Sequence, residues 1–488
     1  MSEAVHAGAA IEERQLLKAL RWYDGFVIAL ANPGFLIGSL GYSIGAIGGW
    51  SAMFLWTVSM FIGVLSNVIY SETAAMFPDK PGGISLYAHE GWRRYFSLVG
   101  PVASFGYWFA WSSVLALFGI VIGSLIQAEW FPGETWTFDT GPVDAGLPHV
   151  IAAVTIVGVW FVNIFGIRPA VWLAYVTGAM LMIPLAVFIV LPYLTGDWES
   201  ANMTWGLNDE GQPWGGWKVA LVWLFVMGWS AYGVETCAAF APEYKDTVND
   251  TNLALRSSAL FSLAVYALLP LGIGGVMSQE AVGENPVAFY VPAFDQIIGG
   301  GSDVMVVLLI ASLLLSMNTA TADGSRALYG IAKDDMTIKE LFHLNRFHVP
   351  SRAMTVDMIV NLALVFFVGN TLAILYTGNV GYMLAHVFAL TAFVLLRRDR
   401  AGWPRPIRVS AIFVPIALVL AAANVLFIYV GVTDPGLTYA AETKHVLIGL
   451  GVLAISIVLF FYRRLVQDRA QITFREETPA MPAGSAGN

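Results

Sequence analysis

Long apolar runs alternate with short polar segments along the whole of this 488-residue chain. A helix that crosses the hydrocarbon core of a bilayer takes about 20 mainly apolar residues. The pattern therefore predicts twelve spanning helices, called spans one to twelve here, over residues 25–48, 51–77, 98–128, 148–166, 169–195, 216–240, 254–278, 302–332, 353–369, 371–396, 407–431 and 444–462. We expect one membrane domain (21–466) between a polar N-terminal tail (1–20) and a C-terminal tail (467–488) whose composition is typical of disorder.

Two of the predicted helices are interrupted near the middle of the membrane. Span one contains Ala31-Asn32-Pro33-Gly34-Phe35, and span six contains Gly228-Trp229-Ser230-Ala231-Tyr232-Gly233-Val234-Glu235. Proline removes a backbone donor, and glycine weakens a helix. Within a bilayer, irregular backbone is tolerated only where protein or a polar cavity surrounds it, and transporters place their substrates at such breaks. The two interruptions therefore predict a small-molecule site where spans one and six meet.

The positions of the breaks also suggest an internal repeat. If spans one to five and six to ten are repeats, the two interrupted helices correspond, and the odd number of helices inverts the second repeat. The predicted fold is an all-α integral membrane protein of twelve helices. It has a five-plus-five inverted repeat (the LeuT-like arrangement), broken helices one and six, and two additional helices.

Each break offers a different half of a zwitterion site. In span one, the amides of Gly34, Phe35 and Leu36 would begin the second half-helix and attract a carboxylate, while a simple proline kink is the alternative. In span six, freed carbonyls could accept hydrogen bonds from an ammonium group. Trp229 and Tyr232 could cover the ligand, or they could be ordinary packing residues.

Glu235 is an ionisable residue inside an apolar span, which is costly and usually functional. Burial favours its protonated form, so it could carry a proton, face a cationic substrate, or be neutralised by internal hydrogen bonds. The predicted substrate-binding residues are Ala31, Asn32, Pro33, Gly34, Phe35, Leu36, Trp108, Gly228, Trp229, Ser230, Tyr232 and Gly233, with Glu235 for proton coupling. Further cavity candidates are Trp111, Ser112, Ser113, Ser312, Ser316, Asn318 and Thr319, and His386 has a weaker claim.

Charged residues are few, at 12% of the chain, and they are distributed unevenly between the predicted loops. With the N-terminus inside, Lys218 and Lys444 are the only two of the 25 lysines and arginines on the outer side. Cytoplasmic loops carry an excess of basic residues. We therefore expect a multi-pass protein of the cell membrane (plasma or inner membrane) with both termini in the cytoplasm.

The sequence gives no sign of an enzyme. The single cysteine, Cys237, cannot form an intramolecular disulfide or a thiolate cluster. We find no phosphate-binding loop of the Walker type, no metal-ligand spacing and no Gly-x-Ser-x-Gly. We expect no cofactor, no metal and no nucleic-acid partner; the partners are a small amino acid or amine and the lipid bilayer, and a homo-oligomer stays open.

Four stretches resemble the amino acid–polyamine–organocation (APC) superfamily, and the resemblance covers residues 20–465. They are Phe77–Tyr87 with its Pro81-Gly82-Gly83 (followed by Gly106-Tyr107-Trp108), Trp229–Thr236, Glu243–Asp246, and Ser325–Asp335 with Val349–Ala353. The resemblance implies a carboxylate site at the first break, a gating aromatic at Trp229, a substrate-facing Tyr232 and a proton-linked Glu235. Two departures are the Ala-Asn-Pro-Gly turn in span one and the absence of a lysine from Ala179–Pro184 in span five.

Together these features predict a secondary active transporter for an amino acid or related amine, working by alternating access as a proton-linked symporter or exchanger. A polyamine or amino-alcohol permease is the alternative. A sensor that binds an amine without moving it is disfavoured by the lack of a signalling module, and a channel by the lack of a charged ring or carbonyl filter.

Overall fold

The computed structural model describes residues 18–78, 80–208, 211 and 213–479. Within them, eleven helical segments are long and apolar enough to cross a membrane. They are α1–α2 (Trp22–Ala29 and Ala31–Ile47), α3 (Gly49–Met76), α5 (Val99–Trp130), α6 (Leu147–Ile164), α7 (Ile167–Thr195), α8 with the 3₁₀ helix η2 (Gly216–Ala231 and Tyr232–Glu243), α9 (Asn249–Gly274), α12 (Ser302–Lys333), α14 (Thr371–Asp399), α15 (Phe413–Thr433), and α16 with the π-helical η5 (Thr443–Tyr462 and Arg463–Gln467).

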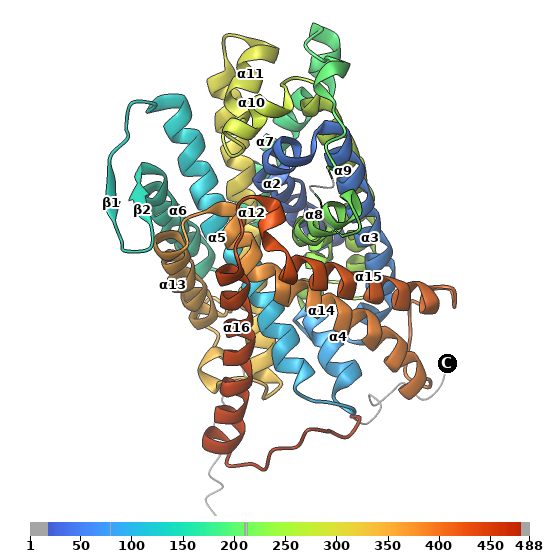
Figure 1. Cartoon of the computed structure of the whole chain (residues 1–488). Coiled ribbons are helices and arrows are strands. Elements are labelled where there is room, and N and C mark those ends of the chain that lie inside the picture. Colours follow the sequence, from blue (N-terminus) through green and yellow to red (C-terminus); the bar gives the residue numbers. More distant parts are fainter. Residues whose placement is uncertain (1–17, 79, 209–210, 212, 480–488) are drawn as a thin grey trace, which may run out of the picture.

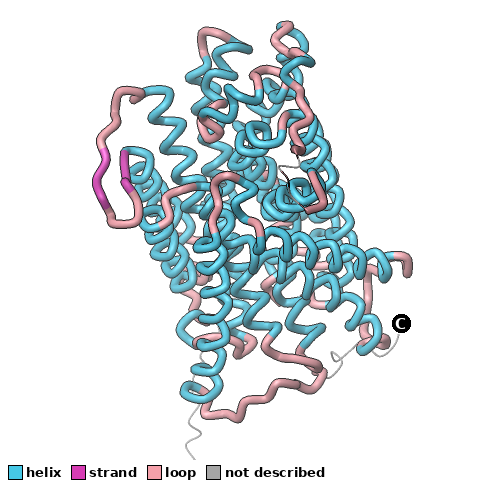
Figure 2. Tube along the Cα trace, viewed as in Figure 1, coloured by secondary structure: helices cyan, strands magenta, loops and turns pink. Residues whose placement is uncertain are grey.

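The predicted ninth span is present as a shorter helix, α13 (Ser351–Phe367), of 17 residues. Such a length lies at the lower end of the range for a membrane crossing, about 17–25 residues. The smaller helices are α4 (Gly83–Trp92), α10 (Gln279–Glu284), α11 (Tyr290–Ile298), and the 3₁₀ turns η1 (Ser200–Asn202), η3 (Lys339–Leu341) and η4 (Pro435–Thr438). The domain is all-helical, as predicted, apart from a short antiparallel ribbon of β1 (Thr137–Asp139) and β2 (Asp144–Gly146) in the loop between α5 and α6 (Figure 2).

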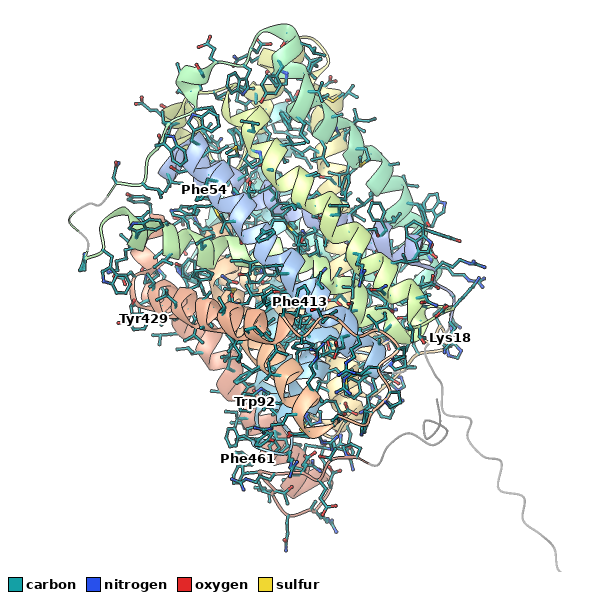
Figure 3. The ribbon with its side chains drawn as sticks, turned by 90° about the vertical axis from the view of Figure 1, so that its right-hand side faces the viewer. Lys18, Phe54, Trp92, Phe413, Tyr429 and Phe461 are labelled. Atoms are coloured by element: carbon teal, nitrogen blue, oxygen red, sulfur yellow. The ribbon has the colours of Figure 1, made fainter. Side chains whose placement is uncertain are left out.

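Helix α5 forms the centre of the bundle and packs against α14, α12 and α6 (Figure 1). It is apolar on all sides, as expected of a helix that neighbouring helices surround. Its contact with α14 is close because Gly106 meets Gly381: a Cβ added to Gly106 would lie 2.3 Å from the Gly381 carbonyl oxygen. The outer helices instead expose large apolar side chains, such as Phe54 and Tyr429 (Figure 3). Those side chains suit contact with lipid rather than with water.

Both interruptions are milder than the predicted unwound stretches. In span one only Leu30 separates α1 from α2, with φ −61° and ψ −13°. In span six the α-helix ends at Ala231 and continues without a coil as the 12-residue 3₁₀ helix η2. Runs of 3₁₀ helix longer than three or four residues are uncommon and often mark a functional hinge. In span one the irregular residue lies just before the predicted stretch Ala31–Phe35, which is itself helical, while in span six the change of helix type falls within the predicted stretch. The prediction therefore overstated how far the backbone opens.

Segments at both ends of the described chain pair with the membrane domain. The backbone amides of Ala19 and Leu20 each donate to the Glu243 carbonyl at 2.9 Å, and Lys245 donates to the Leu20 carbonyl at 2.8 Å. At the other end, the Ser97 amide donates to the Phe474 carbonyl at 2.9 Å. Part of the predicted disordered tail, up to residue 479, is therefore placed against the membrane domain, while residues 1–17 and 480–488 lie outside the described residues.

Candidate functional site

The two interruptions lie side by side in the core. A Cβ added to Gly233 would lie 2.7 Å from Oδ1 of Asn32 and 3.1 Å from Cε2 of the Phe35 ring. Glycine lets the start of η2 rest directly on α2, since any side chain there would displace one of these groups. Residues about 200 positions apart in the sequence thus meet, as the site hypothesis requires.

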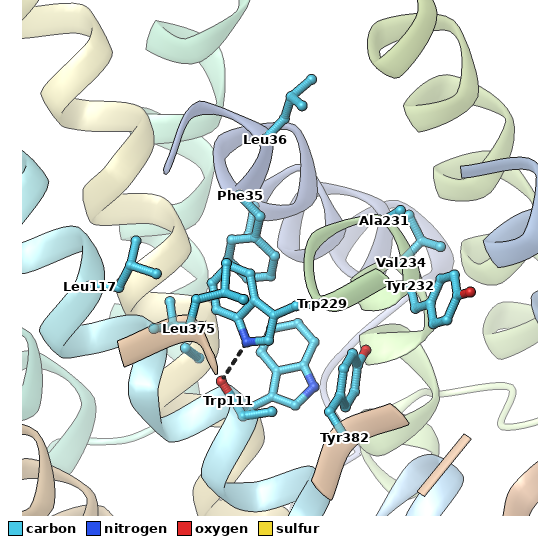
Figure 4. Packing of buried hydrophobic residues seen from close by; sticks show 14 of the residues in the cluster. Phe35, Leu36, Trp111, Leu117, Trp229, Ala231, Tyr232, Val234, Leu375 and Tyr382 are labelled. Atoms are coloured by element: carbon cyan, nitrogen blue, oxygen red, sulfur yellow. Dashed lines mark hydrogen bonds between the residues drawn. The ribbon is translucent and has the colours of Figure 1, made fainter. Parts of the chain in front are cut away.

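An aromatic cluster covers this contact, and we call Phe35, Trp111, Phe118 and Trp229 the aromatic cage. The Phe35 ring centroid lies 5.2 Å from that of Trp111, 5.5 Å from Trp229 and 5.6 Å from Phe118. Trp229 is held by a hydrogen bond from its Nε1 to the Ala110 carbonyl at 3.3 Å (Figure 4).

The aromatic cage encloses almost no free space. Phe35, Trp111 and Trp229 surround a cavity of about 10 Å³, with Ala110, Val114 and Tyr382 completing its wall. That volume is about what one water molecule needs, and far below the volume of an amino acid. The candidate site is therefore closed, and the aromatic side chains would have to separate to admit a ligand.

Glu235 lies beneath the cage and is fully buried. Its Oε1 accepts hydrogen bonds from the Tyr382 hydroxyl at 2.9 Å and from Nε1 of Trp111 at 3.3 Å. The Tyr107 hydroxyl lies 3.3 Å from Oε2 of Glu235 and 2.8 Å from Oδ2 of Asp323, which is also fully buried. Tyr107 has one proton to donate, so it cannot satisfy two ionised carboxylates. The geometry thus favours a proton held by the pair Glu235 and Asp323.

A third buried acid, Asp357, accepts a hydrogen bond from Nε1 of Trp108. Trp108 was a predicted substrate residue, but the structure places it beside α13 and outside the cage, whereas Trp111 lines the cage. The two tryptophans lie three residues apart, on nearly the same face of α5 and one turn from each other. Trp111 was among the further cavity candidates, so this face of α5 was predicted, and the structure places Trp111 rather than Trp108 in the cage.

Side chains from distant helices satisfy the backbone carbonyls of span one. Ser316 of α12 donates to the Ala31 carbonyl at 3.0 Å, and Thr319 donates to the Ile28 carbonyl at 3.1 Å. The Tyr266 hydroxyl donates to the Asn32 carbonyl at 2.9 Å and lies 2.6 Å from Oγ of Ser230. Because Tyr266 gives its proton to Asn32, Ser230 must donate to Tyr266. Ser230 thus links the two breaks instead of facing the cage.

The remaining predicted residues divide between helix packing and other networks. A Cβ at Gly34 would lie 2.4 Å from Oγ of Ser316, so Gly34 allows α2 to approach α12. Tyr232 points away from the cage (Figure 4), donates to Asn424 at 3.0 Å and packs edge-on against His386. Three further predicted positions are buried without lining the cage cavity: Pro33, Leu36 and Gly228.

Three buried carboxylates on the side of the chain termini have a different environment, since each has a basic partner. Glu243 forms a buried ion pair with Arg326, and Glu72 pairs with Arg397 at 2.5 Å. Glu90 of α4, which lies outside the spanning helices, pairs with Arg400 and Lys80, each at 2.7 Å.

The environment of α4 also changes proton affinities. Burial alone would raise the pKa of the Glu90 carboxyl. The positive charges of Lys80 and Arg400 outweigh it and lower this pKa to about 2. Burial lowers the pKa of the neighbouring His89 to about 4. At neutral pH Glu90 is therefore ionised and His89 is neutral.

Buried helices, two interrupted spans in contact and an acid beneath their contact point are typical of the class of secondary transporters. The chain belongs to the amino acid permease family, whose sequence profile matches residues 22–457 and so covers nearly the whole membrane domain. This match confirms the resemblance to the APC superfamily. Members of this family are permeases rather than enzymes.

Relatives with known or provisional names agree with that family. The chain is 22% identical over 420 residues to the glutamate/serine transporter AimA of Bacillus subtilis, covering 81% of this chain and 75% of AimA. It is 25% identical over 332 residues to the arginine/ornithine antiporter of Pseudomonas aeruginosa, covering 64% of this chain and 63% of the antiporter. It is also 25% identical over 307 residues to the uncharacterized amino acid permease YvbW of Bacillus subtilis, covering 62% of this chain and 66% of YvbW.

Proposed function

We propose that this protein is a secondary active transporter that moves an amino acid, or a related amine, across the cell membrane by alternating access. Membership of the amino acid permease family and the transporter names of its relatives support the class of activity. The observation that carries the proposal is the aromatic cage, closed over Glu235 at the point where the two interrupted spans touch. Transporter sites occupy this position in the membrane.

In the proposed binding mode, the substrate enters between Phe35 and Trp229 when the cage opens. Its carboxylate approaches the amides of Gly34, Phe35 and Leu36, which lie one turn inside α2 in the closed structure and become free when the first turn of α2 opens. The new helix start would then favour negative charge. Its ammonium group faces the carbonyls near Gly228 and Gly233 in span six. Trp229 then closes over the bound molecule, since it already packs against Phe35 in the closed structure.

We further propose that Glu235 couples transport to protons, by symport or by exchange. In the part of the chain that the structure describes, neither Glu235 nor Asp323 forms an ion pair. The single hydroxyl of Tyr107 faces one carboxylate oxygen of each residue, and it can donate a proton to only one of them. The other oxygen is satisfied if the pair of acids carries one proton. Opening of the cage would hydrate Glu235 and favour release of that proton.

The proposal includes the twelve-span topology with an inverted repeat and with both termini in the cytoplasm. The charge distribution between loops supports this orientation. The 17-residue α13 would then be the ninth crossing. Cysteine labelling at Lys218 and at Arg408, tested from either side of a sealed vesicle, checks the orientation. A label that reaches position 408 from outside would contradict it.

Uptake of radiolabelled amino acids into proteoliposomes tests the site. We expect Trp229→Leu to lose most of the uptake while the protein still folds. Trp223→Leu is the matched control, because Trp223 is a buried tryptophan on the same helix that does not line the cage cavity. Normal uptake by Trp229→Leu, or an equal loss in Trp223→Leu, would contradict the assignment.

A polyamine or amino-alcohol substrate is the second candidate. The buried Glu235, without a basic partner among the described residues, offers a counter-charge that an extended cation could use. Competition experiments separate the two substrate classes: an amino acid blocks uptake only with its carboxylate intact, whereas a polyamine competes without one. We favour the amino acid because the first break adds a place for a carboxylate.

A further inference from the structure

A second cavity opens at the end of the molecule that carries the chain termini. Its volume is about 840 Å³, within the range of roughly 300–1,000 Å³ typical of small-molecule pockets. Four separate parts of the chain build it: the segment before α1, the start of α7, Lys245 after η2, and the loop between α12 and α13. It shares no lining residue with the aromatic cage.

The charge of this cavity is mainly positive. Lys18, Arg168 and Lys245 line it, and Lys18 lies at the edge of the molecule (Figure 3). Arg168 and Lys245 are exposed and form no ion pair with any residue in the described ranges. The guanidinium carbon of Arg346 lies 4.8 Å from the ring centroid of Phe347, which also lines the cavity.

One acid lines the cavity, but its carboxylate is already occupied. Asp24 accepts a hydrogen bond from the Tyr175 hydroxyl at 2.8 Å and from the Arg21 amide at 2.7 Å. These two donors offset part of its negative charge. Arg168 and Lys245 therefore remain available to an incoming anion.

The wall formed by α7 is apolar and faces outward. Trp172 is 68% exposed, and Tyr175 and Phe165 beside it are exposed as well. Arg168 lies in the first turn of α7 and Tyr175 two turns further along, so the charged and apolar parts follow one another along the helix axis. Aromatic side chains with a polar edge concentrate at the boundary between headgroups and acyl chains. The cavity thus combines cations at headgroup level with an apolar flank toward the hydrocarbon.

We propose that this cavity binds the headgroup of an anionic phospholipid from the leaflet on the side of the chain termini. The phosphate would lie among Lys18, Arg168 and Lys245, and an acyl chain would lie along Trp172. Basic pockets between membrane helices are known to attract such headgroups. The outward-facing apolar flank favours a lipid over a free phosphate, which would leave Trp172 without a partner.

Such a lipid would join three parts of the protein that belong to different spans. Lys18 precedes span one, Arg168 begins span five and Lys245 follows span six. A headgroup that contacts all three would stabilise the closed arrangement on this side by mass action, because it binds that arrangement better than an open one.

The test measures lipid binding to the purified full-length protein by native mass spectrometry in detergent, with phosphatidylglycerol and phosphatidylcholine as probes. We expect phosphatidylglycerol to bind preferentially. The double variant Arg168→Gln/Lys245→Gln should lower its affinity by roughly 30-fold, since each basic residue is worth a factor of about five. Phosphatidylcholine binding to the same sample serves as the internal reference for intact protein.

The matched control is Arg94→Gln/Arg408→Gln, which removes the same charge from the same side of the protein but outside the cavity. This control should keep the preference for phosphatidylglycerol. An unchanged preference in the Arg168/Lys245 variant, or an equal loss in the control, would overturn the proposal. Displacement of the lipid by glycerol 3-phosphate at equal concentration would also overturn it, because the ligand would then be a soluble phosphate.

Discussion

Two groups of buried carboxylates differ sharply in their partners. On the side of the chain termini, Glu243, Glu72 and Glu90 each pair with an arginine. In the centre, Glu235 and Asp323 instead have tyrosine and tryptophan donors, and no ion pair within the described residues. A buried ionised carboxylate without a cation is costly, whereas a protonated one needs only hydrogen bonds. The terminal-side acids therefore hold the fold together, and the central acids are suited to gain and lose a proton.

The largest expected effect comes from breaking the fully buried ion pair of Arg326 and Glu243. Arg326→Met leaves Glu243 as an uncompensated buried charge, and we expect a loss of about 3–5 kcal/mol in the free energy of unfolding. Thermal unfolding in detergent measures it. The double variant Glu243→Gln/Arg326→Met should recover part of the loss, because no lone charge remains. A double variant less stable than Arg326→Met would contradict this account of the terminal-side acids.

The contribution of Glu90 to stability should depend on pH, which tests whether this acid is ionised in the fold. Its pKa of about 2 lies below the ordinary value of 4.5, so ionisation stabilises the fold at all pH values above the unfolded pKa. The linked free energy is about 3 kcal/mol, and it should fall away as pH drops from 4.5 toward 2. Glu90→Gln should therefore be less stable than the natural protein at pH 7, with a smaller difference at pH 3.5. A difference independent of pH would show that Glu90 acts through packing alone.

Replacing the central acid Glu235 should affect transport rather than stability, unlike the replacement of Glu90. A glutamine has nearly the shape of a protonated glutamate, so Glu235→Gln should change the free energy of unfolding by less than about 1 kcal/mol. The same variant should abolish the dependence of uptake on external pH. Asp357→Asn, which removes a buried acid outside the cage, is the comparison variant. A strong loss of stability in Glu235→Gln would mean that Glu235 is ionised and belongs with the structural acids.

The smallest effect is expected at the surface. Lys444 and Glu442 pair at 2.9 Å, but both side chains are 65% exposed. Exposed pairs contribute little to stability, because water screens the two charges. Lys444→Ala should therefore leave thermal unfolding nearly unchanged, which provides the baseline for the three buried acids. A loss of stability as large as that of Glu90→Gln would show that the contribution of an ion pair does not depend on its burial.

Much of the fold follows from the length of the apolar runs. Eleven of the predicted spans are confirmed as helices of sufficient length and hydropathy. They could be predicted because the length of an apolar helix is set by the local sequence. The geometry of the breaks could not be predicted, since it depends on long-range contacts. Ser316 and Thr319 of α12 satisfy carbonyls of span one from nearly 300 residues away, so the backbone need not unwind.

The site shows the same limit at the level of single residues. Phe35 and Trp229 were recognised from the break positions, and both lie in the cage. Asp323 and Asp357 lie toward the ends of predicted spans eight and nine, where water or arginine could meet them, yet both are fully buried. Their hydrogen bonds come from Tyr107 and Trp108 of α5, which only the three-dimensional packing brings beside them. The available signal was an aspartate inside a predicted apolar span, which is costly and usually functional.

The short pairing of Leu20 with Tyr244 has a mechanical consequence. Three backbone hydrogen bonds fasten the chain just before α1 to the end of η2. The start of α1 therefore cannot move independently of the end of η2. Any displacement of α1 either moves the end of η2 as well or breaks all three hydrogen bonds. These bonds join main-chain atoms, so a side-chain substitution at Leu20 or Tyr244 does not remove them directly.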